Sequence, residues 1–192
     1  WQLLDDEARN QSLQYLREDV RAEFLEAMDT AQLVAAAEDL DTDDFADILQ
    51  QLPATITHQV LENLNARDRA RVESVLSYPE DSAGGLMDTD TITVRPRHAI
   101  ELVLRYLRLR KDLPKSTDSL IVVNSADEYV GILPLAKLLT SDPTVTVREI
   151  MASDVAAINV AETDAAVAKI FSERDLISAP VIDDNGILLG RI

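Results

Sequence analysis

The sequence contains no cysteine, only two histidines, and few aromatic residues, which make up 4% of the chain. Without cysteine there can be no disulfide and no thiolate metal site, and a reducing compartment is allowed. No run approaches the roughly 18 apolar residues of a membrane span, and no signal peptide is visible. Since 46% of the residues are apolar, we expect soluble domains with cores of Leu, Val, Ile and Ala.

Positive charge is also scarce. The chain has 18 Lys and Arg residues against 35 Asp and Glu residues, which gives a formal net charge of -17. Because nucleic acids and anionic membranes both require a basic surface, we expect neither as a partner. A cation is the natural ligand of such a surface. The negative charge is concentrated in residues 1–86, which carry a net charge of -13, whereas residues 87–192 carry -4.

Residues 5–76 divide into six consecutive blocks of twelve residues. Each block ends in Leu or Met, has mostly apolar residues at positions eight and nine, and often begins with Asp, Asn or Pro, which favour helix starts. Each block therefore predicts a helix of two to three turns, which is too short to be stable alone. We expect these helices to stack into an all-α, superhelical (solenoid-like) domain over residues 1–86.

One block, residues 41–52, is especially acidic. At 100° per residue, Asp43 and Asp47 lie together on the face opposite the apolar residues. The structural interpretation is that Asp41 is an N-cap, that Asp43 and Asp44 favour the positive start of the helix, and that Asp47 is exposed. The functional interpretation is a pair of carboxylates available to a divalent cation or to another domain.

A change of pattern follows at residues 78–87, Tyr-Pro-Glu-Asp-Ser-Ala-Gly-Gly-Leu-Met. Everything before this stretch predicts helix, and everything after it predicts alternating strands and helices. We expect Pro79 to end a helix, and we expect the Gly84-Gly85 pair to turn the backbone through positive φ. Composition alone indicates an interdomain turn.

Residues 87–192 contain a strand–helix–strand–turn–strand unit twice, with domain boundaries expected at 87–149 and 150–192. The first unit predicts strands at 91–94, 119–123 and 129–133 and helices at 98–110 and 135–139. The second predicts strands at 157–160, 179–182 and 187–190 and a helix at 164–171. Because the second unit stops after its last strand, we expect it to be truncated.

The order of these parts resembles the cytosolic region of MgtE-type magnesium transporters. An acidic helical repeat, the Pro-Glu-Asp-Ser-Ala-Gly-Gly-Leu-Met junction and a doubled β-α-β-β unit cover nearly the whole chain. The resemblance implies an all-α N-terminal domain followed by an α/β tandem pair of cystathionine-β-synthase (CBS) domains. It also implies a position on the cytoplasmic face of the cell membrane, with the membrane pore domain after Ile192.

In this family, Mg²⁺ bound between the N-terminal and CBS domains holds them together and favours the closed pore, and the CBS domains form a homodimer. The resemblance implies five metal-binding carboxylates: Asp43, Asp44, Asp47, Asp164 and Asp175. A backbone carbonyl of Ser172 would add to them. The structural alternatives are an N-cap at Asp164 and a turn residue at Asp175.

Two other classes of function compete with a magnesium sensor. Many CBS pairs bind adenine nucleotides, but here Pro134 and Lys137 replace the family's hydroxyl and ribose-binding carboxylate. Five basic residues are candidates for facing phosphates, or for a solvated face or a contact with the acidic domain: Arg105, Arg108, Arg110, Lys111 and Lys115. The second class is a protein-interaction scaffold. An enzyme is the least expected class, because His58 and His98 suggest no shared site.

Overall fold

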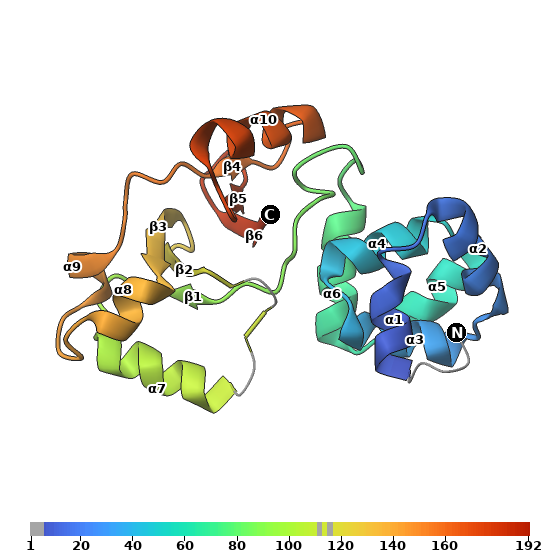
Figure 1. Ribbon diagram of the computed structural model, residues 1–192, viewed down its shortest axis with the longest axis horizontal. Coiled ribbons are helices and arrows are strands. Elements are labelled where there is room, and N and C mark those ends of the chain that lie inside the picture. The colour runs from blue at the N-terminus through green and yellow to red at the C-terminus, as the bar shows by residue number, and fades with distance from the viewer. Residues whose placement is uncertain (1–5, 111–112, 115–116) are drawn as a thin grey trace. The chain divides into compact units, whose positions relative to one another are not determined.

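The computed structural model describes residues 6–110, 113–114 and 117–192 (Figure 1). The chain divides into two compact units, Trp1–Glu80 and Asp81–Ile192, which we call unit 1 and unit 2. The domain boundaries expected after residues 86 and 149 stay predictions. None of the described helices has the length and apolar content that crossing a bilayer requires.

Unit 1 consists of helices in its described part (Figure 1). They are α1 (Asp6–Leu13), α2 (Glu18–Ala27), α3 (Thr30–Asp39), α4 (Thr42–Gln50), α5 (Ala54–Asn63) and α6 (Ala66–Leu76). Their first residues are spaced by twelve, and the residue before each of α2 to α6 is the first residue of a sequence block. Helix α1 packs on α3, α3 on α5, and α4 on α6. The predicted solenoid-like array of short helices is confirmed.

Local hydrogen bonds begin some of these helices, and apolar side chains hold them together. At α3, the Asp29 side chain accepts from the backbone N–H of Gln32 at 2.8 Å, and the Gln32 side chain accepts from the backbone N–H of Asp29 at 3.0 Å. This reciprocal capping box satisfies two otherwise unpaired donors. Side chains from several helices form the core, including Leu13, Leu33, Phe45, Ile48, Leu49 and Val60.

Unit 2 contains two three-stranded sheets with the same topology. Copy 1 comprises β1 (Thr93–Val94), α7 (Ile100–Arg110), β2 (Ser119–Val123), β3 (Tyr129–Pro134) and α8 (Leu135–Thr140). After the short helix α9 (Val147–Ile150), copy 2 comprises β4 (Ile158–Asn159), α10 (Asp164–Arg174), β5 (Pro180–Ile182) and β6 (Leu188–Arg191). In each sheet the first strand is parallel to the second, and the second is antiparallel to the third.

The segment that precedes each copy pairs with the last strand of the other copy. Asp88 and Arg191 exchange backbone hydrogen bonds of 2.8 and 2.9 Å, and Ala152 and Ile132 exchange bonds of 2.8 and 2.9 Å. These bonds extend each sheet by a residue from the opposite copy. The two copies are therefore joined by a reciprocal exchange of their leading segments.

A glycine makes each of these close approaches possible. A Cβ atom on Gly131 would lie 2.4 Å from the carbonyl oxygen of Ala152, and one on Gly190 would lie 2.7 Å from the carbonyl oxygen of Asp88. Real Cβ atoms are not found this close to another atom, so a side chain at either glycine requires the backbone to shift.

The expectation that the Gly84-Gly85 pair turns through positive φ is wrong. Among the glycines, only Gly131 and Gly186 have positive φ, at 151° and 80°. Gly84 and Gly85 are buried, and the Gly84 N–H donates to the carbonyl oxygen of Val160 at 3.0 Å. The junction is held by strand-like pairing to copy 2 and not by a left-handed turn.

Candidate functional site

Two of the candidate carboxylates lie where their charge stabilises the fold. Asp43 and Asp44 are in the first turn of α4, and both are partly buried. Unpaired backbone N–H groups give this end of a helix a partial positive charge, which favours nearby carboxylates. Their position therefore has a structural explanation, although it does not prevent them from binding a cation.

Asp47 lies further along α4, and its carboxylate is costly to ionise. The side chain is half-buried, so the interpretation that Asp47 is exposed is wrong. Burial raises its pKa above the ordinary value, the nearby charge of Glu80 raises it further, and Arg21 partly opposes both effects. The Arg21 Nε donates to the Gln51 side chain at 3.1 Å, which orients the guanidinium.

Glu80 was not a candidate from the sequence, where it is part of the junction motif. Its effect on Asp47 is electrostatic, since two carboxylates of like charge disfavour each other's ionised form. A bound cation would reverse this relation, because both carboxylates would then interact with positive charge. A cation bound beside Asp47 would therefore offset an environment that now disfavours its charge.

Asp164 is the first residue of α10, and the preceding residue caps the helix. The Thr163 hydroxyl accepts from the backbone N–H of Ala166 at 3.3 Å, so the N-cap expected at Asp164 is Thr163 instead. Asp164 is exposed, and one of its carboxylate oxygens accepts from the N–H of Ala165 at 2.6 Å. As with Asp43 and Asp44, a negative charge here is favourable to the helix.

Asp175 lies just past the other end of α10 and carries two local costs. Its φ and ψ are 50° and 44°, the left-handed conformation that favours glycine. Its carboxylate lies at the negative end of the helix, where positive charge is preferred. The N–H groups of Asp175 and Leu176 both donate to the Phe171 carbonyl, which closes the helix end. Ser172 is an exposed residue in the last turn of α10.

Asp164 and Asp175 cannot bind one ion directly. Helix α10 has 11 residues, so they are separated by about 16 Å at a rise of 1.5 Å per residue. Direct Mg²⁺–oxygen bonds are about 2.1 Å long. No group of three or more Asp, Glu or His side chains in the described residues is arranged to hold a metal. Mg²⁺ nevertheless fits isolated carboxylates, because it keeps several waters and is often bound by one or two carboxylates.

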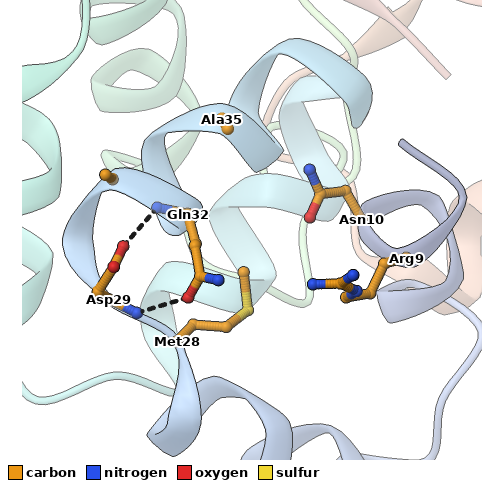
Figure 2. Close-up of a pocket in the computed structure, with 7 residues that line it drawn as sticks. Arg9, Asn10, Met28, Asp29, Gln32 and Ala35 are labelled. Carbon is orange, nitrogen blue, oxygen red and sulfur yellow. Dashed lines mark hydrogen bonds between the residues drawn. The ribbon is translucent and has the colours of Figure 1, made fainter. Parts of the chain in front are cut away.

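Unit 1 also contains a cavity of about 250 Å³, whose lining includes none of the five candidate carboxylates (Figure 2). Its lining comprises Arg9, Asn10, Met28, Asp29, Ala31, Gln32 and Ala35. The polar groups of Asp29 and Gln32 bond to each other in the capping box of α3, and the Asn10 amide donates to Asp39 at 2.8 Å. These polar groups serve the helix array, so this cavity is not a candidate metal site.

The residues considered for nucleotide binding show no common arrangement. Pro134 is the N-cap residue of α8, and Lys137 is exposed in that helix. Arg105 and Arg108 are exposed on α7, whereas Arg110 forms an ion pair with Asp90 at 3.3 Å. Lys111 and Lys115 lie outside the described residues.

Comparison with known families defines the class of each unit. Residues 1–81 match the family model of the MgtE intracellular N domain, and residues 147–192 match that of the CBS domain. Together with the doubled sheet topology, these matches define the chain as an N domain followed by a CBS pair.

Individual relatives identify the family. The chain is 34% identical over 154 residues to the magnesium transporter MgtE of Thermus thermophilus, covering 78% of this chain and 34% of the relative. A crystal structure of the cytosolic domain of the Mg²⁺ channel MgtE in complex with ATP is 32% identical, with a TM-score of 0.91 over 99% of this chain and 78% of that one. The soluble part of another magnesium transporter shares the fold, with a TM-score of 0.88 at 20% identity over 98% of this chain and 75% of that one.

The chain belongs to the MgtE family and corresponds to its cytosolic domain. It spans about one third of the length of the magnesium transporters that it matches.

Proposed function

We propose that this chain is the Mg²⁺-sensing regulatory region of a magnesium transporter or channel and has no catalytic role. Mg²⁺ bound by carboxylates of unit 1 and unit 2 favours the closed pore of the complete protein. The proposed ligands are Asp43, Asp44, Asp47, Asp164 and Asp175. The region lies on the cytoplasmic face of the membrane, and its partner there is the pore domain.

The environment of Asp47 carries this proposal. Its pKa is raised by burial and by Glu80, so ionising it costs more than ionising a solvated aspartate. Asp175 likewise occupies a backbone conformation and a helix end that both disfavour it. Residues that reduce stability are concentrated at functional sites. Bound Mg²⁺ offsets the cost at both positions, which makes them the strongest of the five candidates.

Small-angle X-ray scattering tests the response to magnesium. The chain is measured without divalent ions and then in rising Mg²⁺, with Na⁺ added to a parallel series at matched ionic strength. We expect compaction in the millimolar range of Mg²⁺ beyond that of the Na⁺ series, because a cation reduces the repulsion between acidic surfaces. Equal behaviour in the two series contradicts magnesium sensing by this chain.

Calorimetry of charge-neutral variants tests the ligands. We expect Asp47→Asn and Asp175→Asn each to reduce Mg²⁺ affinity severalfold, and asparagine at 175 retains the left-handed conformation that alanine would disfavour. Glu62→Gln is the matched control, because Glu62 is an exposed carboxylate of unit 1 outside the proposed set. If Asp47→Asn and Asp175→Asn bind Mg²⁺ as Glu62→Gln does, these residues are not ligands.

The raised pKa of Asp47 adds a test that depends on pH. Because its pKa is raised in the folded state, the protonated Asp47 side chain favours folding. This contribution to the free energy of unfolding is fully present below the unfolded pKa of 3.8 and is lost as pH rises through the folded pKa. Without Mg²⁺, we therefore expect Asp47→Asn to be more stable than the wild type at pH 7 and to lose that advantage below pH 4. Thermal unfolding across this range measures the difference.

A homodimer through the CBS copies is the further partner that we propose. What supports it is an apolar stripe on α7 formed by Leu102, Tyr106 and Leu109, whose side chains are 50%, 43% and 74% exposed. We expect Leu109→Glu to shift sedimentation equilibrium towards the monomer. Tyr15→Glu, at an apolar residue of unit 1 that is 82% exposed, is the control. A dimer that is equally strong in both variants excludes the α7 stripe as its interface.

Adenine-nucleotide sensing is the alternative function. It is favoured by the ATP complex of the relative that is 32% identical to this chain. Pro134 and Lys137 argue against a family-type ribose contact in copy 1. Thermal shift with ATP, with and without Mg²⁺, discriminates between the two functions. Stabilisation by ATP without a magnesium-dependent compaction favours nucleotide sensing.

A further inference from the structure

We propose that residues Asp81–Asp88 form a strap that ties the beginning of unit 2 to copy 2, so that this segment and the start of α10 move as one body. The strap precedes copy 1 in the sequence, yet the backbone hydrogen bonds that it makes outside itself, at Asp81, Ala83, Gly84 and Asp88, are with copy 2. A role of the strap in regulation rests on the proposed function, whereas its attachment to copy 2 does not.

The first half of the strap is bonded to the turn between β4 and α10. The Ala83 N–H donates to the carbonyl of Glu162 at 2.7 Å, and the Gly84 N–H donates to that of Val160 at 3.0 Å. In the opposite direction, the Asp164 N–H donates to the carbonyl of Asp81 at 2.9 Å. The first amide of α10 is therefore satisfied by the first residue of unit 2.

Burial makes this attachment a packed contact. Ala83 is 0% exposed, and Ser82 is 6% exposed although it is polar. The Ser82 hydroxyl accepts from the Gly85 N–H at 3.3 Å, and the Ser82 carbonyl accepts from the same group at 3.0 Å. The strap is thus a compact turn whose inner residues are excluded from water, and opening it would expose backbone groups that are now paired.

The second half of the strap is bonded to the last strand of copy 2. Asp88 and Arg191 exchange two backbone hydrogen bonds, and the Met87 side chain is 0% exposed. A Cβ atom on Gly190 would lie 3.0 Å from the Met87 sulfur and 2.7 Å from the Asp88 carbonyl oxygen. Both ends of the strap are therefore fixed on the same copy.

This arrangement assigns different roles to the two copies. The chain of unit 1 continues directly into the strap, so a displacement of copy 2 is transmitted to the end of unit 1 through Asp81. The same residue accepts from Asp164, one of the proposed magnesium ligands. A change at Asp164 on binding Mg²⁺ would thus reach the junction through the hydrogen bond from Asp164 to Asp81, without passing through copy 1.

Hydrogen exchange on the whole chain, read by NMR, tests the strap. Ala83→Pro removes the donor to Glu162. Ala152→Pro is the control, because it removes a backbone donor to Ile132 from the segment that precedes copy 2 and leaves the bonds of the strap unchanged. We expect Ala83→Pro to accelerate exchange of the Asp164 amide at least tenfold and to leave the Ile132 amide unchanged. Ala152→Pro should produce the reverse. If the Asp164 amide changes less than twofold in Ala83→Pro, the strap does not hold the start of α10.

Gly190→Ala is a second variant, in case proline at 83 prevents folding. The added methyl group would clash with the Asp88 carbonyl, which lies at the opposite end of the strap from the residue bonded to Asp164. Faster exchange at both Asp88 and Asp164 supports a strap that behaves as one body, whereas a change confined to Asp88 overturns it. The magnesium titration of Ala83→Pro is then compared with that of the wild type. If the wild type does not respond to Mg²⁺, the proposed function is contradicted. The exchange rates still test the strap in that case, because they are measured without Mg²⁺.

Discussion

Copy 1 and copy 2 of unit 2 share a topology but differ in what their equivalent positions do. At the turn between the last two strands, copy 1 has Asp127 with φ of 62°, and copy 2 has Gly186 with φ of 80°. Asp127 adopts the left-handed conformation and pairs with Arg95 at 2.7 Å, whereas a Cβ atom on Gly186 would have no atom within 4 Å. The same backbone is thus maintained by an ion pair in one copy and by glycine in the other.

The strand that follows this turn shows a second difference. Tyr129 begins β3, and its hydroxyl donates to the carbonyl of Val155 at 2.8 Å, which anchors the segment leading into copy 2. Leu188 begins β6 at the equivalent position and has no hydroxyl to donate. The segment leading into copy 2 is therefore held by a side-chain hydrogen bond as well, whereas the hydrogen bonds described between the strap and copy 2 join backbone groups.

The largest effect is expected from a methyl group at the two close approaches. Gly131→Ala should reduce the stability of unit 2 by about 3 kcal/mol, because it adds both a clash with Ala152 and a disfavoured φ of 151°. Gly190→Ala adds clashes with the Asp88 carbonyl and the Met87 side chain but no disfavoured φ, and we expect about 2 kcal/mol. Urea unfolding followed by circular dichroism measures both. A larger loss for Gly190→Ala would show that the two exchanges are not equivalent.

Removing the Tyr129 hydroxyl tests whether it holds the segment that leads into copy 2. Tyr129→Phe leaves the Val155 carbonyl without this donor and should cost about 1 kcal/mol. Burial, with a smaller effect of Asp154, raises the pKa of Tyr129 to about 12 from 10.0. The neutral Tyr129 hydroxyl therefore contributes to the free energy of unfolding fully below pH 10, and this contribution is lost as pH rises through 12. Wild-type stability should therefore fall over this range more steeply than that of Tyr129→Phe; parallel pH profiles would contradict the assignment.

Gly186→Ala isolates the backbone contribution at the turn. No atom lies within 4 Å of the position of its Cβ, so the cost comes only from the positive φ. We expect about 1 kcal/mol, measured by thermal unfolding. Gly186→Asp, which reproduces the residue found in copy 1, should cost less, because aspartate tolerates this conformation better than alanine. Equal costs for the two variants would assign the role of Asp127 to its ion pair alone.

The smallest effect is expected at the end of α10. Asp175→Gly should stabilise unit 2 by about 0.5 kcal/mol, since it removes a negative charge from the helix C-terminus and relieves the left-handed conformation. Thermal unfolding without divalent ions measures the gain. The end of α7, which carries Arg108 and Arg110, needs no such relief. A loss of stability in Asp175→Gly would show that the carboxylate serves the fold, which would weaken its assignment as a metal ligand.

Local patterns predicted most of the secondary structure. The twelve-residue repeat located the helix starts of unit 1, because most blocks begin with a residue that favours a helix start, and two of these, Asp29 and Asn65, cap α3 and α6 with their side chains. The apolar run at 119–123 coincides with β2. Helix α9 was missed, although Thr146 and Glu149 form a capping box whose sequence signature was visible. The role of Gly84 was predicted wrongly because its partner, Val160, is distant in the sequence.

The candidate site was less accessible to sequence reasoning. The acidic residues of α4 were identified, but the periodicity of one helix does not reveal that Asp47 is half-buried or that Glu80 is close to it. Both facts depend on how the junction follows α6. Similarly, the sequence suggested a turn at Asp175 but not its left-handed backbone, which decides which substitution tests the residue without disturbing the helix end.

The exchange of leading segments has a consequence for how the protein is made. Helices of unit 1 contact neighbours that are close in the sequence, so this unit can fold as it emerges from the ribosome. The strap, in contrast, has to wait for copy 2, because its first half pairs with the turn between β4 and α10 and Asp88 pairs with β6, which follows the other described elements of unit 2 in the chain. During synthesis its N–H and C=O groups lack their partners, so this is the interval in which unit 2 is most exposed to misassembly with another nascent chain.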